Sequence, residues 1–346
     1  MTRELVPLRP EELEEARQFL IGVYQCPPDL PFIRPDHFYW KCFATRPDWP
    51  GARPHVIREA GRIIAFGCIT PATYVLPERT IRGIEVIDWA ADKNFRGAGQ
   101  ELMNSLAALA ETNMGIGGTP PTRHYFRKTS KPFGGMDLFA RPLRPLNQIR
   151  ATPHLNWKLP ARAMRNVAWS TRPLAPSNGW NARRVGEFGE EISELVTDRR
   201  PRLFTRCLHT AETLNYFLSS PMVKFEGYTV ERKGRTEGYF MLASVLGQTR
   251  IVDLLMRTDD QNDWNAAFAV ATRTALVSPE NYEIMSGVSF DLARVALQAN
   301  NFHLRDSWPI MIHDPKDVLA QAPPMNITML EADCAHITDA ASPFLT

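Results

Sequence analysis

The stretch KNFRGAGQELMNSL (residues 93–106) combines a glycine-containing loop with the start of an apolar helical pattern. From Leu102 onward, apolar residues recur at i, i+1, i+4 and i+7, the spacing of one face of an amphipathic helix. The preceding segment IEVIDWA (residues 84–90) is apolar enough for a central strand. The sequence therefore predicts a strand, a short loop and a helix that begins near Gly99.

The loop between this strand and this helix has features of an anion site. At a helix N-terminus, unpaired backbone N–H groups and the positive end of the helix dipole favour negative charge. Gly97 and Gly99 would leave room for a diphosphate near those amides, and Arg96 would add positive charge. The alternative is an ordinary glycine-rich turn that binds nothing. The sequence has neither G-x-x-x-x-G-K-[ST] nor a G-x-G-x-x-G dinucleotide fingerprint, which excludes two common phosphate loops.

Length and composition set the broad class of the protein. A chain of 346 residues favours two domains, and 44% hydrophobic with 23% charged residues is ordinary for a globular protein. The first residues lack the apolar run of a secretory signal, and no apolar stretch approaches the roughly 20 residues that span a bilayer. The five cysteines are scattered without a C-x-x-C pair. We therefore predict a cytoplasmic protein with no metal and no disulfide framework.

Charge is distributed unevenly along the chain, although the net charge is only +2. Between Thr112 and Gly186 the only acidic residue is Asp137, against thirteen Lys and Arg residues. Such a segment attracts anions, so it is either a solvated basic linker or a surface for a phosphate or an acidic partner. No nucleic-acid-binding motif accompanies it, and neither a nucleic acid nor a membrane is the expected partner.

Two segments of the sequence share an order of predicted elements. Residues 55–69 and residues 228–244 each predict a strand, a Gly-Arg turn and a second strand, and the two turns lie half a chain apart. An aromatic-rich helix candidate precedes each hairpin, and a further strand and helix follow it. A repeat of this length indicates two copies of one α/β domain rather than a solenoid of short units.

These features predict three parts of the chain: an N-terminal domain (1–145), a linker or arm (146–181) and a C-terminal domain (182–346). The linker is basic and rich in proline, and its apolar residues predict a short helix that Pro160 interrupts. The last residues have weak periodicity, so we expect a loose tail.

The opening stretch resembles the acetyl-CoA loop of the GNAT acyltransferase superfamily, Q/R-x-x-G-x-G/A at the start of the helix after the fourth strand. Here it is Asn94-x-x-Gly97-x-Gly99, so both glycines match and Asn94 departs from the usual Gln or Arg. The resemblance implies an α/β (α+β) fold of two GNAT-like domains. Each would be a mixed, largely antiparallel sheet flanked by helices, and the two would be joined by the basic Pro-rich linker.

A second family pattern, N-x-x-S-x-x-x-Y-x-K-x-G-F, is matched in part downstream. This chain has Thr119-x-x-Thr122-x-x-x-Phe126-x-Lys128, with KPFGG where Gly-Phe is expected. The family's tyrosine position is therefore occupied by Phe126, and Tyr125 lies beside it.

The resemblance implies acetyl-CoA or another acyl-CoA as co-substrate and an amine as acceptor, with the amine attacking the thioester directly. Most contacts to the diphosphate in this family are backbone amides. The residues assigned to acyl-CoA are Trp89, Ala90, Ala91, Asn94, Phe95, Arg96, Gly97, Ala98, Gly99 and Gln100.

Such a transfer needs a base, an oxyanion donor and a proton for the departing thiolate. Glu85 and Asp88 are the candidate bases, and strand alternation places them on opposite faces, so that only one would face the cleft. For each carboxylate the alternative is a salt bridge to an arginine such as Arg82. Tyr125 is the candidate acid, and its alternative is a packing residue with a satisfied hydroxyl. The oxyanion donor would be a backbone N–H of the strand near Trp89 to Ala91.

The second copy departs from the family where a diphosphate would bind. After the strand TRIVDLLM (residues 249–256) comes RTDDQNDW, with no glycine and with three aspartates. Asp259, Asp260 and Asp263 would repel a diphosphate, so we predict that the second copy does not bind CoA. Tandem GNAT folds with one working cofactor site are known in Fem-type aminoacyltransferases and N-myristoyltransferases, where the second domain helps to shape the acceptor cleft.

The leading hypothesis is a cytoplasmic tandem-GNAT N-acetyltransferase that acts on a small-molecule amine. One alternative is a catalytically silent acyl-CoA-binding or scaffold protein, which Phe126 and Asn94 favour. Another is a Fem-type aminoacyltransferase, which the basic segment permits. The sequence does not specify the acceptor.

Overall fold

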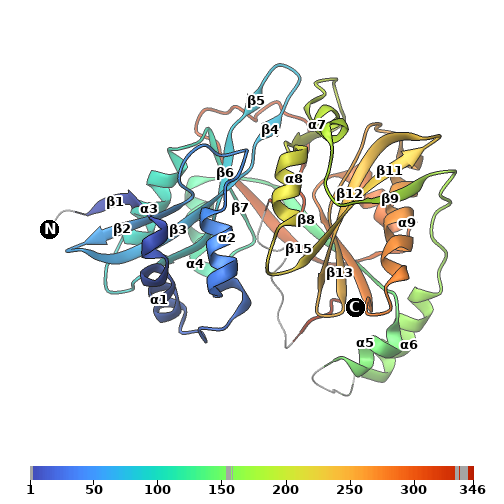
Figure 1. Ribbon diagram of the computed structural model, residues 1–346, viewed down its shortest axis with the longest axis horizontal. Coiled ribbons are helices and arrows are strands. Elements are labelled where there is room, and N and C mark those ends of the chain that lie inside the picture. The colour runs from blue at the N-terminus through green and yellow to red at the C-terminus, as the bar shows by residue number, and fades with distance from the viewer. Residues whose placement is uncertain (1–2, 153–156, 158, 332–334, 336–341) are drawn as a thin grey trace. The chain divides into compact units, whose positions relative to one another are not determined.

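The computed structural model describes residues 3–152, 157, 159–331, 335 and 342–346. Contacts between residues divide the chain into two compact units. Each unit combines a mixed β-sheet with helices, which confirms the predicted α/β fold class (Figure 1). Unit 1 comprises Met1–Gly134, Ser220–Met222 and Pro309–Gln321, and unit 2 comprises Gly135–Ser219, Val223–Trp308 and Ala322–Thr346.

In unit 1 the strand order is β1-β2-β3-β6-β7-β15, and all neighbours are antiparallel except the parallel pair β6 and β7. The strands are β1 (Glu4–Pro7), β2 (Pro54–Glu59), β3 (Arg62–Pro71), β6 (Gly83–Ala91), β7 (Thr112–Ile116) and the end of β15 (His303–His313), with β4 (Tyr74–Val75) and β5 (Thr80–Ile81) as an antiparallel pair outside this sheet. The helices are α1 (Leu13–Tyr24), α2 (Pro35–Phe43), α3 (Ala98–Ala107) and α4 (Pro120–Thr129), with 3-10 turns at Pro10–Glu12 and Pro31–Ile33.

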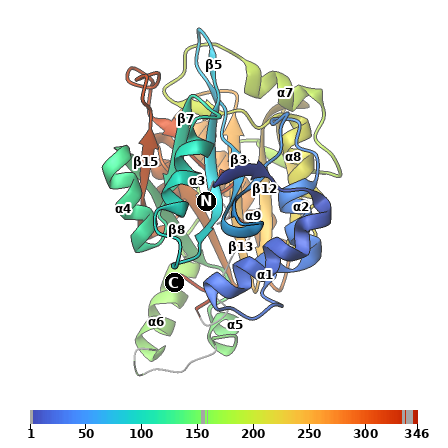
Figure 2. The same cartoon turned by 90° about the vertical axis from the view of Figure 1, so that its left-hand side faces the viewer.

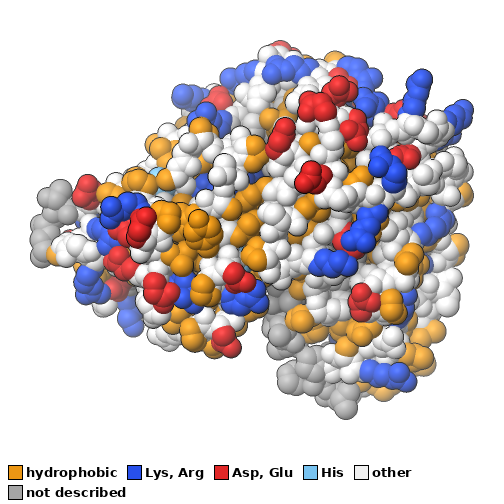
Figure 3. All heavy atoms as spheres, viewed as in Figure 1, with side chains coloured by type: hydrophobic (Ala, Val, Ile, Leu, Met, Phe, Trp, Pro, Cys, Tyr) orange, Lys and Arg blue, Asp and Glu red, His pale blue; other side chains and the backbone are white. Residues whose placement is uncertain are grey.

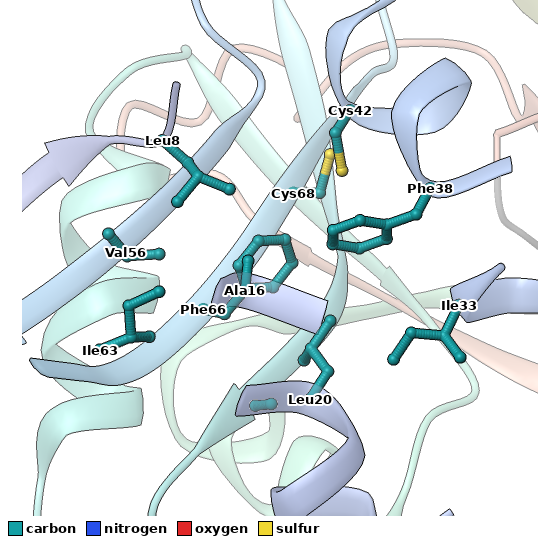
Figure 4. Close-up of a cluster of buried hydrophobic side chains, with 11 residues drawn as sticks. Leu8, Ala16, Leu20, Ile33, Phe38, Cys42, Val56, Ile63, Phe66 and Cys68 are labelled. Carbon is teal, nitrogen blue, oxygen red and sulfur yellow. The ribbon is translucent and has the colours of Figure 1, made fainter. Parts of the chain in front are cut away.

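Two hydrophobic clusters cover the two faces of the unit 1 sheet. Helices α1 and α2 pack on one face through side chains such as Leu20 and Phe38. Helix α3 packs on the other face through side chains such as Leu102. Figure 2 shows α1 and α2 on one side of the strands and α4 on the other. Figure 4 shows the first cluster, in which Cys42 of α2 and Cys68 of β3 turn their sulfur atoms toward each other.

In unit 2 the strand order is β8-β14-β13-β12-β11-β9, and the parallel pair is β13 and β14. The strands are β8 (Lys131–Pro142), β9 (Asn181–Val185), β11 (Lys224–Arg232), β12 (Arg235–Val245), β13 (Gln248–Met256) and β14 (Glu283–Val288), with the short parallel pair β10 (Thr205–Cys207) and β16 (Met325–Asn326). The helices are α5 (Pro145–Arg150), α6 (Leu159–Ser170), α7 (Glu190–Thr197), α8 (Ala211–Leu218), α9 (Gln261–Val277) and α10 (Asp291–Ala299).

The two predicted hairpins are present as β2-β3 and β11-β12. Each turns through two residues with positive φ: Ala60 and Gly61 at 49° and 78°, and Lys233 and Gly234 at 51° and 74°. Positive φ at both central positions matches the right-handed twist of the flanking strands, and glycine adopts it without strain. The repeated turn in the sequence therefore corresponds to a repeated backbone conformation.

Each unit contains a strand from the other half of the sequence. In unit 1, β7 pairs with β15, with Ile116 opposite Ile310. In unit 2, β14 pairs with β8, with Glu283 opposite Pro142. The compact units therefore do not coincide with the predicted ranges 1–145 and 182–346, because each unit includes a strand from the other range. Those ranges stay a prediction about the two copies of the repeat.

Two local expectations about the linker and the tail are wrong. Pro160 opens α6 instead of interrupting a helix, and there its missing N–H removes no intrahelical bond. Among residues 342–346, Phe344 and Thr346 are buried, and the Thr346 amide donates to Glu283 at 2.7 Å. The rest of the expected tail, residues 332–334 and 336–341, lies outside the described residues.

Charged side chains of both signs are interspersed on the face drawn in Figure 3, and hydrophobic atoms gather over α1 and α2. These two helices expose Tyr24 and Tyr39, which are 40% and 52% accessible. In the part of the chain that the structure describes, no helix combines the length and the apolar character needed to cross a bilayer.

Candidate functional site

The parallel strands β6 and β7 separate soon after they begin. Their ladder consists of Gly83–Thr112, Ile84–Asn113 and Glu85–Met114. Beyond it β6 continues to Ala91 and β7 to Ile116, with no further pair between them among the described residues. The other edge of β6 remains paired with β3. The second half of β6 therefore has an open edge, where main-chain groups are available to a ligand.

A β-bulge lies in this open half of β6. The register with β3 shifts between Phe66 and Cys68, opposite Asp88 and Trp89. Asp88 has φ 52°, a left-handed conformation that is uncommon for a non-glycine residue. Because of the extra residue, Ile87 and the later Ala90 both face the α1/α2 cluster, whereas Trp89 faces the α3 cluster.

The bulge corrects the expected placement of the two candidate bases. Asp88 forms an ion pair with Lys41 of α2, and the two side chains are each 5% accessible. Glu85 precedes Ile87 by two residues and lies on the same face. The prediction of opposite faces is therefore wrong, because it assumed unbroken alternation. The partner of Asp88 is a buried lysine rather than an arginine such as Arg82.

Glu85 lies where β6 and β7 separate. It is 7% accessible, and its Oε1 accepts a hydrogen bond from the Ile116 amide at 3.4 Å. The carboxylate thus closes the narrow end of the opening between the two strands.

The loop after β6 is held by its own polar groups. Asp92 Oδ1 accepts hydrogen bonds from the Asn94 amide and the Asn94 side chain, both at 2.9 Å. Gly97 caps α3 with φ 83°, and a Cβ there would meet no atom within 4 Å. Gly97 therefore permits a left-handed turn beside open space.

Gly99 has a different role from Gly97. A Cβ at Gly99 would lie 3.1 Å from the Ala91 Cβ, so the close approach of helix and strand requires glycine. The Trp89 indole donates to the Gly99 carbonyl at 2.9 Å. Among the described residues, the amides of Gly99 and Gln100 donate to no acceptor. These first-turn amides are therefore available to an anion.

A cavity of about 410 Å³ lies beside this helix end. The basic side chains Lys93, Arg96 and Lys128 line it, and none of them forms an ion pair with a described residue. Free amides, a helix N-terminus and unpaired cations together favour a polyanionic ligand. The lining residues are Trp89, Ala91, Asp92, Lys93, Phe95, Arg96, Gly97, Gly99, Gln100, Pro121, His124, Tyr125, Lys128 and Thr129.

Three residues assigned to acyl-CoA from the sequence do not line this cavity. Ala90 and Ala98 are buried in the two hydrophobic clusters. Asn94 is turned toward Asp92 and lines a neighbouring cavity of about 450 Å³ on the α1 side of the loop. The other assigned residues all belong to the lining.

Neighbours on α4 have separate roles. The Tyr125 hydroxyl donates to Asn104 Oδ1 at 2.8 Å, and its ring meets Trp89 edge-on at 5.3 Å. Burial raises the pKa of Tyr125 above its usual value, with partial opposition from Thr129. Phe126 instead packs on β7 at Gly115, where an added Cβ would fall 2.4 Å from its ring.

The sequence assignment missed the part of the lining that α4 supplies. Pro121, His124, Tyr125 and Lys128 recur at the spacing of one helical face. Lys128 was already in the partial family pattern, and this spacing is the signal that could have extended the set. Asp92 and Lys93 precede the glycine loop, and no motif in the sequence indicated that they would line a cavity.

Three arginines of the basic segment in unit 2, Arg141, Arg144 and Arg162, bind main-chain carbonyl groups. Arg141 is 3% accessible and donates to the carbonyl of Asn300 at 2.6 Å. Arg144 donates to the carbonyls of Asn281 and Leu276. These arginines therefore stabilise the fold of unit 2. Among the described residues, no group of three His, Cys, Asp or Glu side chains could hold a metal ion.

No family model matches this chain, and no curated protein matches it by sequence. Solved structures do match its fold. An Enterococcus faecalis protein of unknown function, named a probable N-acyltransferase, superposes with TM-score 0.59 at 14% identity over 90% of this chain and 72% of its own. A GCN5-related N-acetyltransferase from Anabaena variabilis gives 0.59 at 11% identity, with the same coverage. Saccharomyces cerevisiae N-myristoyltransferase with bound myristoyl-CoA gives 0.54 at 14% identity, over 90% of this chain and 82% of its own.

The fold of this chain is therefore similar to that of solved GCN5-related N-acetyltransferases and N-myristoyltransferase. This agrees with the resemblance carried by the glycine loop and confirms it at the level of the fold.

Proposed function

We propose that this chain is an acyl-CoA-dependent N-acyltransferase. One observation carries the proposal: a cavity of about 410 Å³ joins the N-terminus of α3 to the bulged strand β6. It is lined by Gly99 and Gln100, whose amides have no acceptor among the described residues, and by three cations that form no ion pair with a described residue. A CoA thioester carries a diphosphate, a 3′-phosphate and a thioester arm with two amide groups. The amides and cations suit the phosphates, and the open edge of β6 suits the amide groups of the arm.

In the transfer, the acceptor nitrogen attacks the thioester carbonyl carbon. A C–N bond forms, the C–S bond breaks, one proton leaves the amine and the thiolate leaves with a proton. Of the two candidate bases we favour Glu85, because the Asp88 carboxylate is engaged by Lys41. A base near the attacking amine typically contributes about 10²–10⁴-fold to the rate.

Two further groups complete this proposal. Tyr125 lines the cavity as a neutral phenol, since its pKa is raised by burial, and it is the proposed proton donor to the thiolate. A backbone N–H near Trp89, beside the bulge, is the proposed donor to the developing oxyanion. Acetyl is the proposed acyl group and a small-molecule amine the proposed acceptor, in the cytoplasm.

The experiment is calorimetric binding of acetyl-CoA and myristoyl-CoA, with thermal unfolding followed in parallel. Ligand at about 100 times its dissociation constant should stabilise the protein by roughly 2.7 kcal/mol. Arg96→Glu with Lys128→Glu should weaken binding strongly. Lys131→Glu is the matched control, because Lys131 is exposed, pairs with Asp317 and does not line the cavity. If neither acyl-CoA binds the wild type, the proposal is lost.

A silent acyl-CoA-binding protein is the second candidate, and the packing of Phe126 on Gly115 favours it. The residue at the family's tyrosine position carries no hydroxyl and is buried. Binding without release of free CoA across a panel of amines would select this candidate. Release of CoA that depends on the amine would select the transferase.

A further inference from the structure

The bulge in β6 combines two features that are unfavourable in isolation. Asp88 is held at φ 52°, a conformation that strains residues with a side chain. Its carboxylate is buried against Lys41, and two well-packed apolar side chains would often stabilise a core at least as well as such a pair. Strain of this kind persists where the surroundings over-determine it, and it clusters at functional sites.

Lys41 is fixed by more than its ion pair. Its Nζ donates to the Phe32 carbonyl at 3.1 Å and lies 5.3 Å from the centre of the Phe38 ring. Burial alone would lower the pKa of Lys41, but the Asp88 carboxylate and two nearby thiols raise it above its usual value. Lys41 therefore carries its charge into the core and holds the Asp88 side chain on the α1/α2 face.

The residue after Asp88 connects this pair to the cavity on the opposite face. The Trp89 carbonyl accepts a hydrogen bond from the Tyr24 hydroxyl at 3.3 Å. The Trp89 indole donates to the Gly99 carbonyl and its ring packs against Tyr125. The peptide unit between Asp88 and Trp89 therefore determines both the main chain at the open edge of β6 and the side chain that supports the glycine loop.

We propose that Lys41 and Asp88 are positioning residues: their buried pair holds the β6 bulge so that the Trp89 main chain faces the reacting carbonyl and the Trp89 indole supports the loop at Gly99. This inference rests on the proposed function. It assigns Asp88 a role through Trp89, in place of the role of base considered from the sequence.

The test compares three variants with the wild type. Lys41→Met removes the cation and leaves the Asp88 carboxylate buried. Lys41→Met with Asp88→Gly removes both charges and installs the residue that adopts positive φ without strain. Arg46→Met is the matched control, because it breaks a buried pair with Asp48 (side chains 4% and 11% accessible) in the same unit but not on β6. The measurements are Tm, kcat, KM and the dissociation constant of acetyl-CoA.

We expect Lys41→Met to lower kcat by about 100-fold, the effect of a small misplacement of reacting groups. The double variant should recover most of that loss, whereas Arg46→Met should lower Tm and leave kcat unchanged. The positioning role is overturned if the folded double variant stays as slow as Lys41→Met, or if Arg46→Met lowers kcat equally.

A second readout works without turnover or ligand. The indole N–H resonance of Trp89, assigned with Trp89→Phe, reports its hydrogen bond to Gly99. It should shift and lose protection from exchange in Lys41→Met and return in the double variant. An unchanged resonance in Lys41→Met would overturn the inference even if no acyl-CoA bound. A changed resonance with no acyl-CoA binding would overturn only the proposed function.

Discussion

In both units a bulged central strand runs parallel to its neighbour for a few residues and then diverges from it. In unit 1 this strand is β6, and in unit 2 it is β13, whose ladder with β14 ends at Ile251 and Ser286. The register of β13 with β12 shifts opposite Val252, much as that of β6 shifts opposite Asp88. The two halves of the sequence therefore build the same frame.

The openings differ in what occupies them. In unit 2 the chain's own segment after β16 enters the opening, where the Met329 amide donates to the Val252 carbonyl at 3.1 Å. Asn326 of β16 and Thr328 of this segment line a residual cavity of only about 10 Å³ between β13 and β14. In unit 1 the cavity beside β6, α3 and α4 is about 410 Å³. When a segment of the chain bonds to the open edge of a bulged strand, that edge becomes part of the core. When no segment does so, the main-chain groups of the edge remain available to a ligand.

A buried polar cluster holds this segment in unit 2. His209 Nδ1 lies 2.8 Å from Asp253, and its Nε2 lies 3.2 Å from Glu331 at the end of the segment. The Tyr239 hydroxyl donates to Asp253 at 2.7 Å. Burial and these carboxylates raise the pKa of the Cys207 thiol well above its usual value.

The N-termini of the helices that follow β6 and β13 also differ in whether their backbone amides already have acceptors. In unit 1 the amides of Gly99 and Gln100 donate to no acceptor among the described residues, whereas in unit 2 Asp260 caps α9 and accepts from the amides of Asn262 and Asp263. A capping carboxylate occupies the place that a phosphate would take. This supports the prediction that the second copy binds no CoA, which stays a prediction.

The largest effect should come from Glu85, which lies where β6 and β7 separate in unit 1. Glu85→Gln should lower kcat by about 10²–10⁴-fold, because the base is lost, while Tm stays close to that of the wild type. The measurement is steady-state release of CoA, together with acetyl-CoA affinity. Glu101→Gln, an exposed carboxylate on α3, is the control. A loss in kcat of less than about threefold would remove Glu85 from the mechanism.

In unit 2 the same kind of change should act on stability instead. His209→Leu leaves two buried carboxylates facing a side chain that cannot donate, which should cost about 3–5 kcal/mol of the free energy of unfolding. Urea denaturation followed by circular dichroism measures it, with the exposed His124→Leu as a control for stability. The acetyl-CoA dissociation constant of His209→Leu should not change. A loss below about 1 kcal/mol would mean that the cluster does not hold the segment.

Removing the cap of α9 tests whether free amides alone make a site. Asp260→Ala should cost about 1 kcal/mol of stability. It should not create a second acyl-CoA site, because the opening beside α9 is filled. Calorimetry should still give one acyl-CoA per chain. Asp291→Ala, in the first turn of α10 but not its cap, is the control, and a second equivalent in Asp260→Ala alone would break the comparison.

The sequence carried the parts of this comparison that local physics determines. The two hairpin turns follow from Gly61 and Gly234, and the turn before α3 from Gly97, because glycine alone adopts their backbone without strain. The bulge at Asp88 could not be predicted, since the buried partner of Asp88 is Lys41, which is distant in sequence. Strand exchange was equally hidden, because a strand pattern does not specify which sheet the strand joins.

The last expected effect concerns the pH dependence of stability in unit 1. Burial, with the charges of Lys41 and Arg34, lowers the pKa of His37 from 6.5 to about 3. The folded state therefore keeps His37 neutral while the unfolded chain takes up a proton, so this stability is present above pH 6.5 and is lost as the pH falls toward 3. The slope is at most about 1.4 kcal/mol per pH unit.

His37→Phe keeps an aromatic ring beside Trp40 and should flatten the dependence of unfolding free energy on pH between 6 and 4. Urea unfolding at several pH values measures this slope. His303→Phe is the comparison in unit 2: its pKa is lowered to about 4, by burial and then by nearby arginines, but the residue is only partly buried. Its flattening should be smaller, because solvent screens a partly exposed ring. Equal slopes in the wild type and His37→Phe would show that His37 takes up its proton without unfolding, and that the α2 side of the bulge is more open to water than its burial indicates.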